Sequence, residues 1–205
     1  ANPDDLSPEY INDLQKLGFN RLSIGVQSFL DDELTLMNRA HNGIEALSSV
    51  EYAKKRFDNV SIDLLFGNPN TTLGDWKRNL DYALQLEVPH ISSYALTLES
   101  KTALERFVDK GVVSLLDEGV VEAQFHHLVD TLTLAGYDHY ELSSFGKPGY
   151  HSQNNTGYWQ GKTYLGIGPS AHGFDGDQRY WNVSNNASYL KQIAKEELPQ
   201  TIEKL

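Results

Sequence analysis

Two predicted strands, each followed by a helix and each ending in polar residues, constrain this chain more than any other feature. The first is expected over residues 21–26, where apolar and small residues alternate, and it runs into Gln27. The second is expected over residues 60–66; it carries Asp63 and ends in Gly67-Asn68-Pro69. Consecutive units of this kind are typical of a β/α barrel, in which ligands lie at the C-terminal ends of the strands.

Hydrophobic periodicity and capping signals predict the other elements. Half of the 16 glycines and many aromatic residues fall late in the chain, which predicts short strands and ordered loops there, with a frayed tail after Leu198. The fold class is therefore α/β, with the later part of a partial β/α (TIM-like) barrel over residues 1–136 and a small α+β region over residues 137–205. A third strand is expected over residues 90–98, and helices over residues 7–17, 31–37, 43–56, 74–86, 103–110, 118–135 and 185–195.

Composition excludes several classes of protein. The formal net charge is -11, with 17 basic and 28 acidic residues, which argues against binding to nucleic acid or to anionic membranes. No apolar run approaches the roughly 20 residues that span a bilayer, and the chain opens without a signal peptide, so a cytoplasmic location is expected. The chain has no cysteine, so it can form neither disulfides nor cysteine-ligated metal sites.

Six segments occur in an order and spacing that resemble one known family. They read NRLSIGVQSF, NRAH, SIDLLFGNP, HISSYALTLE, YELSSF and YLGIGPSAHGF. The chain resembles the oxygen-independent coproporphyrinogen III oxidase family of radical S-adenosylmethionine (SAM) proteins, and more closely its haem-chaperone branch. The resemblance extends from residue 2 to about residue 189.

The resemblance implies two cofactors, SAM and a 4Fe–4S cluster held by three closely spaced cysteines near the N-terminus of the family's proteins. This chain has none of these cysteines, so we expect a C-terminal fragment of a longer protein that holds no metal and is inactive by itself. A complete domain that has lost its cluster is the alternative.

Three residues match the family's SAM site: Gln27, Arg39 and Asp63. Their chemistry suits a nucleoside amino acid, because arginine grips a carboxylate, glutamine both donates and accepts, and a carboxylate accepts from hydroxyl or ammonium groups. Polar strand ends tied into local hydrogen bonds are the structural alternative. Gly25 and Gly67 permit close backbone approach beside this site, or serve packing alone. Asn68 departs from the family's usual Gly-Leu-Pro turn.

The resemblance also implies a haem or substrate site. Asn155, Tyr158 and Trp159 match a His-Asn-x-x-Tyr-Trp motif linked with haem, but Asn154 stands where that motif has its histidine. A carboxamide is a poor iron ligand, so axial ligation at position 154 is not expected.

Other histidines are less clearly assigned. His151 could substitute for the missing ligand, and His172, in a glycine-rich turn, could be a ligand, a proton donor or a structural residue. The glycines around it lack the Lys-Ser/Thr pair of a phosphate loop. The adjacent His126 and His127 point to different helix faces and are expected on the surface. His41 stays undecided.

The predicted function is haem binding and delivery in porphyrin metabolism, with haem or a porphyrin as ligand and a haem-accepting protein as partner. One alternative, implied by the resemblance, is an oxidoreductase that decarboxylates coproporphyrinogen III to protoporphyrinogen IX using SAM and the cluster. A second alternative is a barrel enzyme or binding domain unrelated to SAM. Haem binding without turnover of coproporphyrinogen III would distinguish haem delivery from the decarboxylating oxidoreductase.

Overall fold

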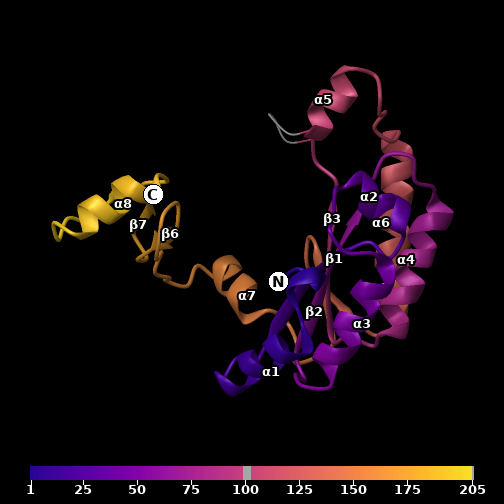
Figure 1. The fold of residues 1–205 in the computed structure, drawn as a ribbon, viewed down its shortest axis with the longest axis horizontal. Coiled ribbons are helices and arrows are strands. Elements are labelled where there is room, and N and C mark those ends of the chain that lie inside the picture. The colour runs from indigo at the N-terminus through magenta and orange to yellow at the C-terminus, as the bar shows by residue number, and fades with distance from the viewer. Residues whose placement is uncertain (99–102, 205) are drawn as a thin grey trace. The chain divides into compact units, whose positions relative to one another are not determined.

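The computed structural model describes residues 1–98 and 103–204, which form two compact units, Ala1–His151 and Ser152–Leu205. The first unit is built on a five-stranded sheet in the order β1-β2-β3-β5-β4 (Figure 1). The first three strands are parallel, and β5 and β4 extend the sheet in antiparallel pairing. The strands are β1 (Leu22–Gln27), β2 (Val60–Phe66), β3 (His90–Ala95), β4 (Asp138–Glu141) and β5 (Ser144–Gly146).

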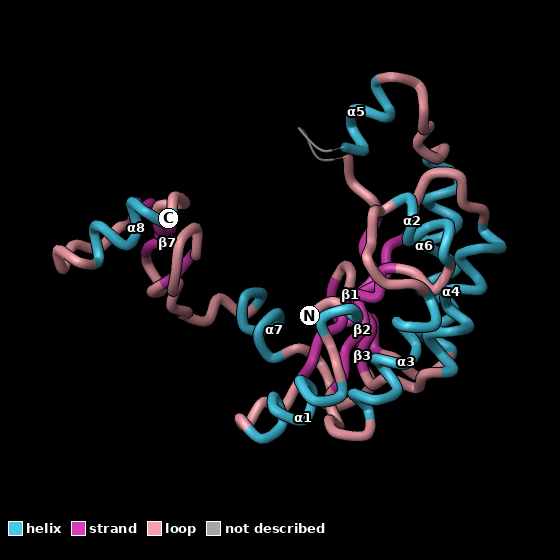
Figure 2. Tube along the Cα trace, viewed as in Figure 1, coloured by secondary structure: helices cyan, strands magenta, loops and turns pink. Residues whose placement is uncertain are grey.

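The helices of this unit alternate with the parallel strands, as expected for β/α units, and Figure 2 shows α3 and α4 together on one side of the sheet. Each helix predicted for this unit is present, with ends displaced by at most two residues. Ser7 caps α1 by accepting from the amide of Tyr10 at 3.2 Å. The helices are η1 (Pro3–Asp5), α1 (Pro8–Lys16), α2 (Asp31–Leu36), α3 (Gly43–Lys54), α4 (Leu73–Gln85), α5 (Ala103–Asp109) and α6 (Glu118–Leu134).

Alternation along the strands gives the sheet one apolar and one polar face. Ile62 and Leu64 of β2 are fully buried in the core, together with apolar residues of the helices. Asp63 lies between them in sequence and therefore projects from the opposite face, where its register partner on β3 is Ser92. The polar face corresponds to the inside of a β/α barrel and positions the candidate site.

The boundary between the units differs from the predicted one. The sequence prediction placed the change after Gly136, but β4 and β5 follow that residue and belong to the first unit. The reason is their pairing: Phe145 of β5 lies opposite Ile91 of β3 and is fully buried. The predicted third strand also ends earlier, at Ala95, although the amide of Leu96 still donates to the carbonyl of Phe66 at 2.8 Å.

The second unit consists of a three-stranded antiparallel sheet and two helices, and it corrects two predictions. The tail after Leu198 is not frayed, because β8 pairs along its whole length with β7. Residues 153–159, which were expected to form loops or strands, form a helix that is capped by Ser152. Its elements are α7 (Gln153–Trp159), β6 (His172–Phe174), β7 (Gln178–Asn182), α8 (Asn186–Ile193) and β8 (Gln200–Lys204).

The length and hydropathy of a helix decide whether it can span a membrane. Among residues 1–98 and 103–204, none of the helices combines the length and hydropathy needed to cross a bilayer.

Candidate functional site

The polar face of the first unit centres on Asp63. The hydroxyl of Ser23, on the neighbouring strand, donates to Oδ1 of Asp63 at 3.1 Å. Burial raises the pKa of this carboxyl, and the raise is partly offset by the Ser23 bond and by the positive charges of the N-terminus and Arg21. Burial also disfavours the charged form of Arg21, and it therefore lowers the pKa of that guanidinium. Ser23 therefore engages Oδ1 of Asp63, and no hydrogen bond to Oδ2 is found within residues 1–98 and 103–204, which leaves that oxygen for a ligand.

The C-terminal end of β1 holds Gln27 in an unusual backbone conformation. Its φ is 68°, and the amide of Ser28 donates to the carbonyl of Val26 at 2.9 Å, so a three-residue γ-turn centres on Gln27. A left-handed φ at a non-glycine residue is strained and is often found at functional positions. The pairing register of β1 with β2 also shifts before Gln27, which turns its side chain out of the regular ladder.

His41 contacts the backbone of this turn from the core. Its ring is buried, with Nε2 3.1 Å from the carbonyl oxygen of Val26 and Nδ1 3.4 Å from Oδ1 of Asp4. The carbonyl that closes the turn at Gln27 thus has a second partner. The sequence left the orientation of His41 open, and the structure shows that it contacts the strand end from within the core.

Gly25 makes room for the side chain of Gln27. A Cβ at position 25 would lie 2.8 Å from Nε2 of Gln27 and 3.7 Å from Oδ1 of Asn2. The same Asn2 oxygen accepts from Nη1 of Arg39 at 3.4 Å. The predicted residues Gln27 and Arg39 therefore both lie near Asn2, and a side chain at position 25 would displace the amide group of Gln27.

Arg39 also lines a cavity of about 560 Å³ beyond the ends of the strands. Its other walls are largely apolar and come from α2, α5 and the ends of β2 and β3. A cation at the edge of an apolar cavity suits a ligand that joins a carboxylate to an apolar or aromatic part. The apolar walls include Leu36, Leu65, Leu96, Leu104 and Phe107.

The second unit contains a cavity of about 640 Å³ that joins two of the residues predicted for haem, Tyr158 and His172. Its other walls include Asn154, Leu165 and Ile167. The ring of Tyr158 meets Tyr164 edge to face, with centroids 4.7 Å apart.

The other two residues predicted for haem, Asn155 and Trp159, do not line this cavity. Asn155 is half-buried in α7 and Trp159 is 72% exposed. The structure thus brings together only part of the predicted set.

One residue that fixes the loop beside this cavity was not predicted from the sequence. Asn182 of β7 is buried, and its Nδ2 donates to the carbonyls of Gly166 at 3.2 Å and of Gly168 at 2.9 Å. A Cβ at Gly166 would lie 2.4 Å from the carbonyl oxygen of His172, so the loop approaches β6 as only glycine allows. Asparagine is depleted in strands, so an asparagine in β7 could have indicated a specific hydrogen-bonding role.

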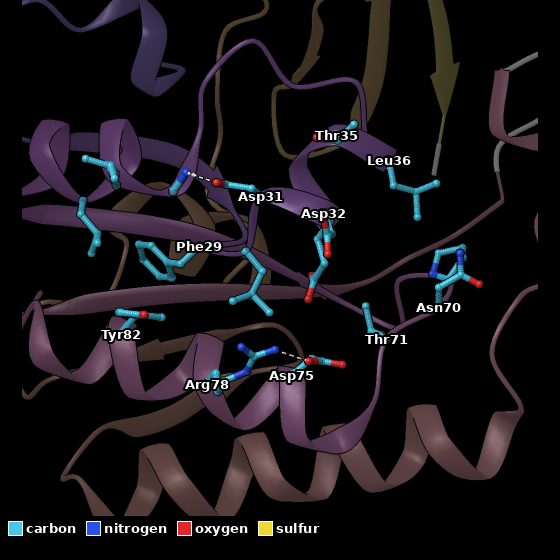
Figure 3. A pocket seen from close by; sticks show the side chains of 16 residues that line it. Phe29, Asp31, Asp32, Thr35, Leu36, Asn70, Thr71, Asp75, Arg78 and Tyr82 are labelled. Atoms are coloured by element: carbon cyan, nitrogen blue, oxygen red, sulfur yellow. Dashed lines mark hydrogen bonds and ion pairs between the residues drawn. The ribbon is translucent and has the colours of Figure 1, made fainter.

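A third cavity, of about 730 Å³, lies between α2, α3 and α4 and was not predicted (Figure 3). Asp31, Asp32, Glu33 and Asp75 line it, whereas its one lining cation, Arg78, is already paired with Asp75. Like-charge repulsion makes these walls unfavourable for a ligand that carries carboxylates. The largest of the three cavities therefore does not suit a porphyrin acid.

Glu33 explains the unusual Asn68. The carboxylate of Glu33 is buried and accepts from Nδ2 of Asn68 at 2.8 Å and from Nδ2 of Asn79 at 3.2 Å. Asn79 in turn accepts from the hydroxyl of Ser28 and the amide of Phe29. Asn68 thus pairs with a buried acid, and the polar residue in the Gly-Asn-Pro turn serves a local network.

This buried acid gives the first prediction. Burial raises the pKa of Glu33, so the folded state keeps a proton at pH values where the unfolded state has released it. Stability is then greatest below the unfolded pKa and falls as the pH rises through the folded pKa. Glu33→Gln is expected to flatten this decline in urea unfolding between pH 4 and pH 7. The exposed Glu51→Gln is the control, and an unchanged slope in Glu33→Gln would contradict the assignment.

The remaining histidines lie elsewhere. His126 and His127 are on α6, where His126 lies near Glu122 and His127 near Thr131. His126 is exposed, as predicted, and His127 is half-buried. His151 pairs with Asp138 at 3.0 Å in the first unit, outside the residues that line the cavity of the second.

Comparison with known proteins identifies the lineage. A profile described as "Radical SAM superfamily" matches residues 1–83. Heme chaperone HemW from Mycobacterium tuberculosis (strain ATCC 25618 / H37Rv) is 37% identical over 201 residues, covering 97% of this chain and 51% of the relative. Heme chaperone HemW from Bacillus subtilis (strain 168) is 37% identical over 200 residues, covering 97% and 53%. The chain thus spans about half the length of the curated relatives it matches.

A solved structure shares the fold. Coproporphyrinogen III oxidase (HemN) from Escherichia coli, described as a radical SAM enzyme, superposes with a TM-score of 0.81 at 21% identity, covering 100% of this chain and 50% of that one. The predicted α/β fold, part of a TIM-like barrel, is confirmed by this likeness and by the parallel strands of the first unit. The chain therefore belongs to the oxygen-independent coproporphyrinogen III oxidase-like family of radical SAM proteins, on the branch of the HemW relatives.

Proposed function

We propose that this chain is part of a radical SAM protein that binds haem and delivers it to an acceptor protein in the cytoplasm. The observation that carries the proposal is the cavity of about 640 Å³ in the second unit, where an imidazole, two phenol rings and aliphatic side chains line one space. Apolar and aromatic walls with a few polar groups are typical of cofactor sites. The names of the 37% identical relatives, heme chaperones, support the same ligand.

The SAM part of the proposal rests on the first unit. Arg39 offers its guanidinium to the carboxylate of SAM, and Gln27 and Asp63 offer hydrogen-bonding groups to its ammonium or hydroxyl groups. A bound 4Fe–4S cluster would supply the electron that cleaves SAM. The 205 residues contain no cysteine, so the residues of this chain do not fit the cluster.

The SAM site gives the second prediction. Removing a charged partner from a hydrogen-bonded pair costs roughly 1.5–3 kcal/mol, so Arg39→Leu is expected to weaken SAM binding about 10- to 100-fold. Asp63→Asn is expected to weaken it less, because the amide keeps one acceptor oxygen. The measurement is calorimetric titration of a fusion that places before Ala1 an N-terminal segment with the three cluster cysteines that the family resemblance implies.

Arg78→Leu is the matched control for Arg39→Leu, because Arg78 is exposed and lines a different cavity. Equal affinities of the Arg39 variant and the unaltered fusion would refute the SAM role. The same fusion, supplied anaerobically with SAM, a reductant and coproporphyrinogen III, tests the function. Formation of protoporphyrinogen IX would overturn haem delivery in favour of decarboxylation.

Haem binding is the direct test on the chain itself. Ferric haem titrated into the 205-residue protein is expected to give a saturable Soret absorbance change with one site per chain. Because the cavity lies entirely in the second unit, binding requires neither SAM nor the cluster. The absence of a saturable change would reject the haem proposal.

A further inference from the structure

The seven histidines of the chain all lie among the described residues, and they differ in whether their ring nitrogens are occupied. Six have a hydrogen-bond or ion-pair partner within the described part of the chain. The partners are the Val26 carbonyl for His41, Ser61 and Tyr140 for His90, Glu122 for His126, Thr131 for His127, the Leu142 carbonyl for His139 and Asp138 for His151.

His172 is the exception. No hydrogen bond or ion pair to its ring nitrogens is found among residues 1–98 and 103–204, and its side chain is exposed. The ring packs near Trp181, with centroids 6.0 Å apart and planes inclined at 32°. An imidazole that is restrained by a ring but not engaged by a hydrogen bond is available to ligate a metal.

The surroundings of His172 suit a flat apolar ligand. The cavity that His172 lines also contains the rings of Tyr158 and Tyr164 and the exposed side chains of Leu165 and Ile167, which are 75% and 78% exposed. Exposed aliphatic side chains grouped in one cavity favour a ligand with apolar faces. An iron porphyrin combines such faces with a metal that accepts an imidazole.

Asn154 lines the same cavity as His172. At position 154 the related motif has its histidine, and the carboxamide that replaces it is a poor ligand for iron. The cavity therefore has no imidazole at position 154 of α7, but it has the imidazole of His172 on β6, whose ring nitrogens are not engaged within the described residues.

We propose that His172 is the axial ligand of haem iron in this cavity and takes the place of the histidine absent at position 154. The assignment rests on the proposed haem function and deepens it by naming the metal ligand. His172 would hold the iron through one imidazole, and solvent or an acceptor protein would supply any further ligand. Such a site is suited to transfer of the haem.

The test is a titration of ferric haem into the 205-residue chain and its variants, followed by absorbance and electron paramagnetic resonance. The wild type is expected to show an imidazole-ligated ferric haem. His172→Ala is expected to lose this signature and to bind haem at least 10-fold more weakly, whereas His126→Ala is expected to match the wild type. Added free imidazole is expected to restore the signature in His172→Ala, which shows that the cavity is still folded.

Each outcome separates the ligand from the function. Wild-type spectrum and affinity in both His172→Ala and the more conservative His172→Gln would overturn the ligand assignment while leaving haem binding intact. A wild-type chain that binds no haem would overturn the proposed function, and the ligand assignment with it. A tyrosinate-type spectrum in the wild type would assign the iron to Tyr158 or Tyr164 and would also overturn His172.

Discussion

Replacing Trp76 by alanine is expected to destabilise the first unit by about 3–5 kcal/mol, the usual loss for removing a large buried aromatic side chain. Trp76 is 2% exposed, and its ring lies 5.6 Å from that of Phe66. Its Nε1 donates to the carbonyl of Gln124 at 2.9 Å. Gln124 in turn accepts from the amide of Gly67 at 2.8 Å, so this tryptophan helps to fix the end of β2 near the candidate site.

The measurement is urea unfolding followed by circular dichroism. Trp76→Phe is the first control; it keeps most of the buried ring and loses mainly the hydrogen bond, with an expected loss of about 1 kcal/mol. Leu134→Ala, on a residue of α6 that is 91% exposed, is expected to change stability by less than about 0.5 kcal/mol. A loss in Trp76→Ala no larger than in Leu134→Ala would contradict the packing described for α4 and α6.

Acidification is expected to destabilise the protein strongly through His90. This residue is 1% exposed, with Nδ1 2.7 Å from the hydroxyl of Ser61 and Nε2 2.7 Å from the hydroxyl of Tyr140. Burial, followed by the positive charges of Arg21 and His151, lowers the pKa of His90 to about 3. The neutral imidazole is therefore part of the folded polar face.

The sign follows from proton binding. The unfolded state takes up a proton near pH 6.5 and the folded state only near pH 3, so stability is complete at neutral pH and is lost as the pH falls between these values. At pH 4.5 the loss is about 3 kcal/mol relative to pH 7, because each pH unit in this window contributes about 1.4 kcal/mol. His90→Asn is expected to be less stable at pH 7 but to have a flatter profile.

The comparison of slopes isolates His90 from other groups. Glu33 and Asp63 have raised pKa values, which favour the folded state in acid, but they are present in both proteins and cancel in the difference. Urea unfolding at pH 7, 5.5 and 4.5 measures the slopes. Parallel profiles for the wild type and His90→Asn would show that His90 does not titrate between the two states as described.

Much of the candidate site could be predicted because it lies within or at the end of two parallel strands. Gln27 and Asp63 follow from the alternation along two strands and from the family motifs, and the structure places both on or beside the polar face. The polar partners were not predictable in the same way. Ser23 was seen only as a small residue of a strand, and its bond to Asp63 depends on a register that joins residues 40 positions apart.

The haem residues show the same limit. Residues of one motif were expected to act together, yet Tyr158 lines the cavity while Asn155 and Trp159 do not. The reason is local: residues 153–159 form a helix, so neighbours in the motif project in different directions. Proximity in sequence is therefore a poor guide to proximity in this cavity.

The sequence by itself determined the alternating helices and parallel strands of the first unit, the α/β class and the family, because these depend on local periodicity, on caps such as Ser7 and on motif order. Only the tertiary structure decided that residues 200–204 form a strand, that Asn68 pairs with Glu33, and that His172 differs from the other histidines in having no hydrogen bond or ion pair to either ring nitrogen within the described residues. Each of these depends on contacts between segments far apart in the chain, and such contacts form only when strand register and helix packing bring particular side chains within hydrogen-bonding distance.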